Sequence, residues 1–219
     1  MSLTYSIGDI HGSLDKLERL MLQCEQDAGG QPATFVFLGD YIDRGPHSSG
    51  VIAYLIEMQS RFGERVIALK GNHEAMALGA IDGMTPLRPW FMQGGDTTLE
   101  SYGGVGPGAL PQEHVAWMRS LRLSHDDGRR FFVHAGIDPE QPLAMQVEAA
   151  LLWIREPFLS HTGDYGRLIV HGHTPQLTGA PDLRSNRLNI DTAAVFGGPL
   201  TAAVFDDAKA PPLRILQAW

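Results

Sequence analysis

The chain has 219 residues, of which 43% are hydrophobic and 19% are charged, and its formal net charge is −8 because 25 acidic residues outnumber 17 basic ones. This composition is typical of a globular protein, and we expect one domain that covers residues 1–219. The acidic balance argues against a basic nucleic-acid-binding surface, and no apolar run reaches the ~18 residues that suggest a membrane span. Neither nucleic acid nor a membrane is therefore an expected partner.

Two further features predict where the protein resides. The first three residues run directly into an apolar segment, which leaves no room for a signal peptide and predicts a cytoplasmic location. Cys24 is the only cysteine, so an intramolecular disulfide and a thiolate metal site are both excluded. We expect Cys24 to be a core residue and the protein to be a monomer.

The first third of the chain repeats a strand, a polar loop and a helix. Apolar runs at 4–7, 35–38 and 66–69 indicate buried strands, and helices are expected from 13 to about 29, from 48 to 62 and from 74 to 80. The loops carry the sequences GDIHG at 8–12, GDYIDRG at 39–45 and GNHE at 71–74. Because parallel strands end at the same edge of a sheet, the polar side chains of these loops should converge.

Residues 81–110 have neither a helical nor a strand period and contain many glycines and prolines. We interpret them as a loop-rich cover beside the site. Trp90, Phe91 and Tyr102 in this cover could contact a substrate, or they could pack the cover onto the core.

The second half of the chain supplies further polar residues at strand ends. A helix is expected over 111–121, and a strand over 130–133 presents His134. Another strand at 168–170 leads into the sequence HGHTP at 171–175. His171 and His173 lie two residues apart at the end of this strand, and only one of them is expected to be a ligand.

The C-terminal part alternates between apolar runs and turns. Runs at 188–190, 200–205 and 213–216 indicate strands, which we expect to build the second sheet. The predicted fold is α/β, with a central β-sandwich of two mixed sheets, helices on both outer faces and the polar site at one edge of the sandwich.

The polar residues predict a metal centre. Asp, His and Asn supply oxygen and imidazole ligands, which suit divalent manganese, iron or zinc. Asp40 comes from the middle of the three N-terminal loops and is best placed to bridge two ions, with Asp9 and His11 on one side and Asn72 with a later histidine on the other. A two-ion centre indicates hydrolysis of a phosphate ester.

Five ordered blocks, GDIHG, GDYIDRG, GNHE, VHAG at 133–136 and HGHTP, resemble the phosphoprotein phosphatase family of calcineurin-like metallophosphoesterases. The stretches at 152–156 and 190–196 are similar to the small bacterial and phage members of that family. The resemblance spans nearly the whole chain, whereas a lone GDxHG would be a weak signal.

The resemblance implies a role for each matching residue. Manganese is the expected metal, with iron and zinc as alternatives. The implied proton donor is His73, oriented by Asp43. Glu74 could support Arg44 or cap its helix, and the role of His171 stays open. The implied metal ligands are Asp9, His11, Asp40, Asn72, His134 and His173, and the implied phosphate contacts are Arg44, Arg155 and Asn72.

The expected activity is that of a phosphomonoesterase, in the first place a serine/threonine protein phosphatase with possible activity on phosphotyrosine. Direct attack on phosphorus by a hydroxide between the two ions requires no phosphoenzyme. The alternative is a symmetrical dinucleoside tetraphosphate hydrolase, which shares the same blocks. A nuclease or cyclic phosphodiesterase fits less well, because Pro175 stands where a second histidine is usual. A catalytically inactive binding protein fits poorly, because every expected ligand position is filled.

Overall fold

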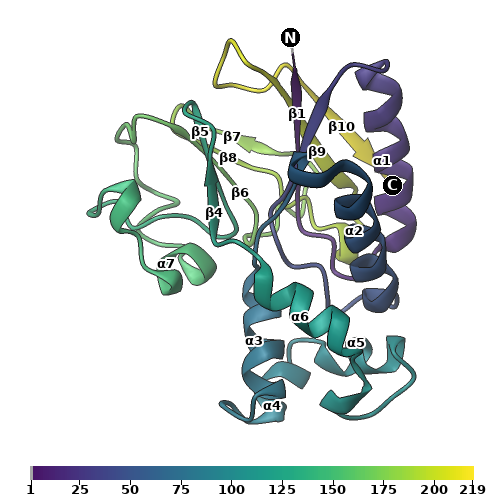
Figure 1. Cartoon of the computed structure of the whole chain (residues 1–219). Helices are drawn as coiled ribbons and strands as arrows, with labels where there is room; N and C mark the ends of the chain where they lie inside the picture. The colour runs from purple at the N-terminus through teal and green to yellow at the C-terminus, as the bar shows by residue number, and fades with distance from the viewer. Residues whose placement is uncertain (1) are drawn as a thin grey trace.

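The computed structural model describes residues 2–219 and contains two mixed five-stranded sheets with helices around them (Figure 1). The first sheet has the order β10 (Arg214–Ala218), β9 (Leu200–Asp206), β1 (Leu3–Ile7), β2 (Ala33–Phe37) and β3 (Val66–Ala68). The second has the order β4 (Ser124–Asp126), β5 (Arg130–Val133), β6 (Leu168–His171), β8 (Arg187–Asn189) and β7 (Asp182–Leu183). The predicted β-sandwich with flanking helices is confirmed.

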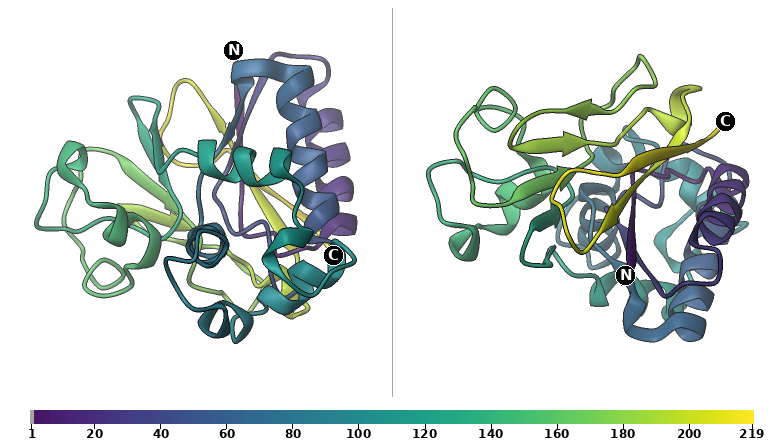
Figure 2. Two further views of the ribbon diagram at one scale, coloured as in Figure 1. Left: turned by 60° about the horizontal axis from the view of Figure 1, so that its bottom comes forward. Right: turned by 90° about the horizontal axis from the view of Figure 1, so that it is seen from above.

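The helices lie in three groups, as Figures 1 and 2 show. The long helices α1 (Leu14–Ala28) and α2 (Ser48–Phe62) run beside the first sheet, and α7 (Glu148–Trp153) lies beside the second. Below the sheets lie α3 (Asn72–Ile81), α4 (Leu87–Phe91), α5 (Gly95–Ser101) and α6 (Gln112–Ser120). Short 3-10 helices occupy Gly63–Arg65, Pro107–Ala109, Leu143–Met145 and Ala194–Phe196. Within residues 2–219, no helix has the length and apolar character needed to cross a membrane.

The alternation of side chains along β2 explains the layers. Phe35 and Phe37 pack into the cluster that α1 and α2 share with the first sheet, whereas Val36 points the other way and joins the core between the sheets. The same inter-sheet core contains Phe132 of β5 and Phe205 of β9, whose rings lie 6.1 Å apart. Because successive side chains of a strand alternate in direction, each sheet presents one face to its partner sheet.

The prediction that the C-terminal strands build the second sheet is wrong for two of them. β9 pairs antiparallel with β1, with Leu3 opposite Asp206 and Ile7 opposite Ala202, and β10 pairs with β9. Only β8 lies in the second sheet. An apolar run identifies a strand but not its partner. β9 is buried along nearly its whole length because one face packs into the core beside the helices and the other into the core between the sheets.

The prediction of a loop-rich cover at 81–110 is also wrong in part, because this segment contains α4, α5 and a 3-10 helix. Trp90 is buried, and Phe91 is half-buried and packs against the core. The hydroxyl of Tyr102 lies 2.7 Å from Nδ1 of His114. The structure thus favours packing over substrate contact for these aromatic side chains.

Candidate metal centre and active site

The polar loops converge where the strands end. The loops after β1 and β2 are joined by backbone hydrogen bonds, since the N–H groups of Ile10 and His11 both donate to the carbonyl of Asp40. The loop after β6 is joined to the end of β5, because Gly172 N–H donates to the carbonyl of His134 at 2.8 Å. Segments that lie far apart in the sequence are therefore joined in pairs where the strands end.

Several non-glycine residues of the site have a positive backbone φ. Among residues 2–219, six non-glycine residues have a positive φ, and five of them were predicted site residues. A positive φ is unfavourable for residues with a Cβ and persists where the surrounding structure requires it. The residues, with φ in degrees, are His11 (45), Asp40 (54), Asp43 (73), Arg44 (69), His173 (64) and Ala193 (60).

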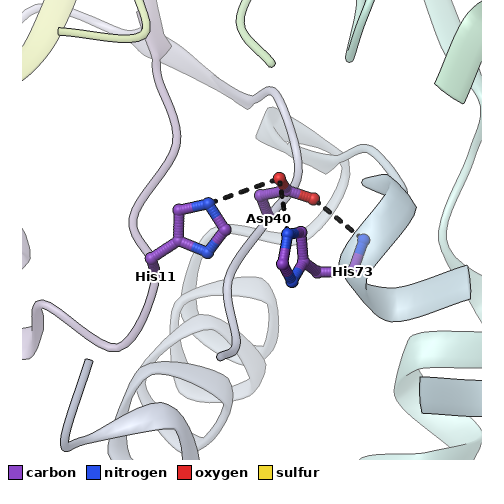
Figure 3. A group of neighbouring side chains, drawn as sticks. All are labelled: His11, Asp40 and His73. Carbon is purple, nitrogen blue, oxygen red and sulfur yellow. Dashed lines mark hydrogen bonds and ion pairs between the residues drawn. The ribbon is translucent and has the colours of Figure 1, made fainter. Parts of the chain in front are cut away.

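Asp40 is the centre of the site. Its Oδ2 lies 3.4 Å from Nε2 of His11 and 3.9 Å from Nε2 of His73, and Figure 3 shows the two imidazoles on different sides of the carboxylate. Its Oδ1 accepts the backbone N–H of His73 at 3.1 Å and lies 3.4 Å from Nε2 of His134. The carboxylate thus faces two sets of nitrogen ligands with its two oxygens.

A second group of polar side chains meets at Asn72. Its Oδ1 lies 2.8 Å from Nε2 of His134 and 2.9 Å from Nδ1 of His173. Asn72 opens α3, so the helix start directs its side chain toward β5 and β6. Asp40, His134 and His173 place their ligand atoms within 4.8 Å of one another, as do His11, Asp40 and His73. The shared member of both groups is Asp40.

Two histidines of the site, His11 and His134, have a protonation state that suits metal binding. Nδ1 of His11 lies 2.8 Å from the carbonyl of Ile42, and Nδ1 of His134 lies 3.0 Å from the carbonyl of Leu38. A carbonyl only accepts, so Nδ1 carries the proton in both rings and Nε2 presents its lone pair to the site. Burial lowers the pKa of His11 to about 3 and also lowers the pKa of His134. Neutral imidazoles of this kind fit a metal ion.

Asp9 is buried beside the same loops but lies outside both groups. Its carboxylate accepts the backbone N–H of His173 at 3.1 Å, and it touches Gly172 so closely that a Cβ there would collide with it. Burial raises the pKa of Asp9 well above its usual value, and the charges of Asp191 and Asp40 raise it further. Three buried carboxylates that repel one another fit a site that receives cations.

The sequence interpretation assigned no role to Asp191. The residue is buried and lies two positions after the end of β8, with Ile190 between them. Its carboxylate accepts the backbone N–H of Ala193. Burial raises the pKa of Asp191 to about 7. The signal that could have found it is its position, because Asp191 follows a buried strand just as Asp9 does.

His73 is held by Asp43. Nδ1 of His73 lies 2.6 Å from Oδ2 of Asp43, and both side chains are buried. Burial lowers the pKa of His73, but the charge of Asp40 and the hydrogen bond to Asp43 outweigh this effect and leave the pKa raised. The arrangement leaves Nε2 on the side of the ring that faces Asp40. Asp43 in turn accepts hydrogen bonds from Trp90 and Thr98. The sequence interpretation considered Trp90 only as a substrate contact or a packing residue, and it gave Thr98 no role.

Glu74 caps its helix and also holds the loop after β2. Its Oε2 accepts the N–H groups of Gly71 and Asp40, each at 2.9 Å, and its Oε1 accepts those of Tyr41 at 2.8 Å and Ile42 at 3.3 Å. Burial and the charge of Asp40 raise the pKa of Glu74, while backbone donors such as the N–H of Tyr41 oppose that shift. The alternative that Glu74 caps the helix is therefore confirmed.

The two arginines lie at a cavity of about 270 Å³ above the ligand groups. Nη1 of Arg44 lies 2.6 Å from Nε2 of His11, and the guanidinium of Arg155 lies near the carbonyl of His173. Residues that line the cavity are Asp40, Arg44, Asn72, His73, Gln93, Trp153, Arg155, His173, Pro175 and Phe196. The three predicted phosphate contacts, Arg44, Arg155 and Asn72, thus line the same cavity as His73.

His171 faces away from this cavity. It is buried, its ring lies 5.0 Å from that of Phe158, and Nδ1 lies 3.1 Å from the carbonyl of Gly172. The structure therefore places His173, rather than His171, in a ligand group. Burial lowers the pKa of His171 to about 3, so the ring is neutral at physiological pH.

Comparison with known proteins decides the family. The model of the calcineurin-like phosphoesterases matches residues 4–199. The chain belongs to the calcineurin-like metallophosphoesterases. It is 34% identical to serine/threonine-protein phosphatase 1 of Salmonella typhimurium over 206 residues, which cover 90% of this chain and 89% of that protein. It is also 30% identical to the symmetrical bis(5'-nucleosyl)-tetraphosphatase of Dechloromonas aromatica over 154 residues, 68% of this chain and 51% of that protein.

Solved structures support the fold of this metallophosphoesterase. One neighbour, described as a candidate diadenosine tetraphosphatase, has a TM-score of 0.73 and 21% identity over 99% of this chain and 94% of the neighbour. A cold-active protein tyrosine phosphatase has a TM-score of 0.70 and 19% identity over 94% of this chain and 74% of the neighbour. At these identities the likeness extends to the fold alone. The family is metal-dependent and dinuclear, and the paired His and Asp groups around Asp40 fit that requirement.

Proposed function

We propose that this metallophosphoesterase is a phosphomonoesterase with two divalent ions, manganese first among the candidates, and that it acts on phosphoserine and phosphothreonine in proteins. The observation that carries the proposal is that Arg44 and Arg155 line the same cavity as His73 and the Asp40 ligand groups. Two guanidinium groups and a proton donor around one cavity suit a terminal phosphate dianion. The 34% identity to the Salmonella phosphatase over nearly the whole chain supports the same choice.

We assign Asp40 to both ions because its two oxygens face different groups of ligands. When bound, the ions supply a water nucleophile at neutral pH and neutralise part of the phosphate charge. Asp9 and His11 would complete the site of the first ion, and Asn72, His134 and His173 would complete that of the second. The neutral state of the imidazoles and the repulsion among the carboxylates support this assignment.

The chain's own residues then position the ester and move the proton. Arg44 and Arg155 hold the phosphoryl oxygens by charge-assisted hydrogen bonds, and Asn72 contributes a contact beside them. His73 donates the proton on Nε2 to the leaving oxygen as the P–O bond breaks. Nδ1 keeps its hydrogen bond to Asp43, so the ring stays oriented throughout the transfer.

A symmetrical dinucleoside tetraphosphatase is the second candidate, and an observation at the rim of the cavity favours it. Trp153 and Phe196 are exposed there, with 47% and 58% of their surface accessible, and the Arg44 guanidinium lies 5.5 Å from the centre of the Phe196 ring. Exposed aromatic rings beside a phosphate site could stack on a nucleobase. The 30% identity to the Dechloromonas enzyme supports this reading, although the matched region is only half of that protein.

A direct comparison of substrates tests the proposal. The enzyme is assayed at fixed enzyme and manganese concentrations on phosphoserine, phosphothreonine and phosphotyrosine peptides and on diadenosine tetraphosphate. We expect the highest kcat/KM on a phosphoserine or phosphothreonine peptide. A higher kcat/KM on diadenosine tetraphosphate would replace the first candidate by the second, and activity on neither class would contradict both.

A further inference from the structure

Asp43 is a buried carboxylate of the site, and two of its hydrogen-bond partners come from the α4–α5 segment. Nε1–H of Trp90, on α4, donates to both carboxylate oxygens of Asp43, at 3.0 Å from Oδ1 and 2.9 Å from Oδ2. The hydroxyl of Thr98, on α5, donates to Oδ1 at 2.7 Å and accepts the backbone N–H of Asp43 at 2.8 Å. The hydroxyl of Ser48 also accepts that N–H, at 3.1 Å.

These contacts fix which oxygen of Asp43 faces His73. Thr98 takes Oδ1, so Oδ2 is left for Nδ1 of His73 at 2.6 Å, and the Trp90 indole spans both oxygens. Asp43, Thr98 and Trp90 are at most 1% exposed, so water cannot replace a lost partner. The carboxylate therefore has a single orientation and, through it, so does the imidazole.

The same segment also holds the backbone of Arg44. The carbonyl of Gly94, between α4 and α5, accepts the N–H of Arg44 at 3.2 Å. Gly94 has a φ of 95°, and a Cβ at this position would lie 2.5 Å from the nitrogen of Arg44. The α4–α5 segment is thus in direct contact with both residues of the Asp43-Arg44 pair, and the close approach requires glycine.

We infer that Trp90 and Thr98 are positioning residues of the reaction, and that they act through Asp43 on the proton donor His73. The inference rests on the proposed function of His73 as the general acid. Neither residue reaches the cavity where the phosphate is expected, since Trp90 and Thr98 are absent from its lining. Because both side chains bind Asp43 directly, we expect their effect on the rate to pass through the orientation and hydrogen bonding of that carboxylate.

The role predicts a specific kinetic signature. Misplacing the proton donor matters most when the leaving group is a basic alkoxide and little when it is p-nitrophenolate, whose conjugate acid has a pKa of about 7. Loss of a hydrogen bond to a charged group in the transition state lowers a rate constant by about a factor of 10 to 100. We therefore expect Thr98→Val and Trp90→Phe to lose about 10- to 100-fold in kcat on a phosphoserine peptide, but only about threefold or less on p-nitrophenyl phosphate.

The experiment compares both variants with His73→Asn on the two substrates, at equal and measured metal content. Thr98→Ser, which keeps the hydroxyl, should retain most of the activity on phosphoserine. Trp117→Phe is the matched control for loss of a buried indole donor, because Nε1 of Trp117 donates to Gln59 rather than to Asp43. If Thr98→Val does not fold, Trp90→Phe carries the test alone.

A double-mutant cycle separates this role from a structural one. If Thr98 acts through Asp43, Thr98→Val should cost little further activity once Asp43→Asn is present, whereas independent effects would multiply. Equal losses on both substrates, or multiplying losses in the cycle, would overturn the inference. If His73→Asn itself loses equally on both substrates, the proposed proton donor is wrong and the inference falls with it. If only His73→Asn discriminates between the substrates, the inference alone is refuted.

Discussion

Glu74 should be a main source of stability for the loop that carries Asp40. Its buried carboxylate accepts four backbone N–H groups, two on each oxygen, and three of these come from residues 40–42. In Glu74→Gln one carboxylate oxygen becomes an NH₂ group, which faces two N–H donors that then lack an acceptor. Each buried donor left unpaired costs about 1–3 kcal/mol, so we expect a loss of about 2–6 kcal/mol of unfolding free energy.

That loss is large for a chain of this size. With about 2–4 °C of melting temperature per kcal/mol, the expected fall in Tm is about 10 °C. The assay is thermal unfolding with a chelator present, so that metal binding does not mask the difference. Glu57→Gln, on the exposed face of α2, is the matched control and should shift Tm by less than about 2 °C. If Glu74→Gln has the same Tm as the Glu57→Gln control, the assignment of the four hydrogen bonds is refuted.

Three further outcomes are expected. His73→Asn should keep its metal but lose a factor of about 10²–10⁴ in kcat on a phosphoserine peptide, far more than on p-nitrophenyl phosphate. Steady-state kinetics with metal analysis test this, and equal losses on the two substrates would contradict it. Arg44→Ala and Arg155→Ala should each lower kcat/KM by about one to two decades with little change in Tm, because a bidentate charged contact is worth about 1.5–3 kcal/mol; unchanged kinetics with a lower Tm would make that arginine structural. The hydrogen bonds from Arg214 hold the pKa of Asp27 below its usual value. Stability from this pair is therefore present above pH ~4 and lost as the pH falls through the lowered pKa. Asp27→Asn should thus destabilise more at pH 7 than at about pH 2, as urea unfolding at the two pH values would show.

The sequence was sufficient to predict that several polar residues at strand ends lie close together in space. His11, Asp40 and His134 each follow an apolar run, and strands that run in parallel must end at the same edge. The glycines of the blocks added a further signal, since Gly39 has a φ of 103° and leaves no space for a Cβ beside Gly71. Such local rules need no knowledge of the tertiary structure.

The sequence was not sufficient where the relevant partner lies far away along the chain. Trp90 and Thr98 bind Asp43 across 47 and 55 residues, and their segment has no period that distinguishes a helix from a loop. The sheet of β9 was missed for a similar reason, because burial on both faces does not tell which strand lies next to it. Glu74 was ambiguous because a carboxylate three residues after a turn glycine suits both a helix cap and an ion pair.

The central claim is that Asp40 joins two cations in one phosphoesterase centre. Its most direct test is metal analysis of the active protein after saturation with manganese and removal of the unbound metal, with activity measured on the same samples. We predict two ions per chain, activity that follows occupancy of both sites, and a decrease in both quantities in Asp40→Asn. Full activity with one ion per chain or none, or an Asp40→Asn protein that binds two ions as tightly as before, would contradict the account.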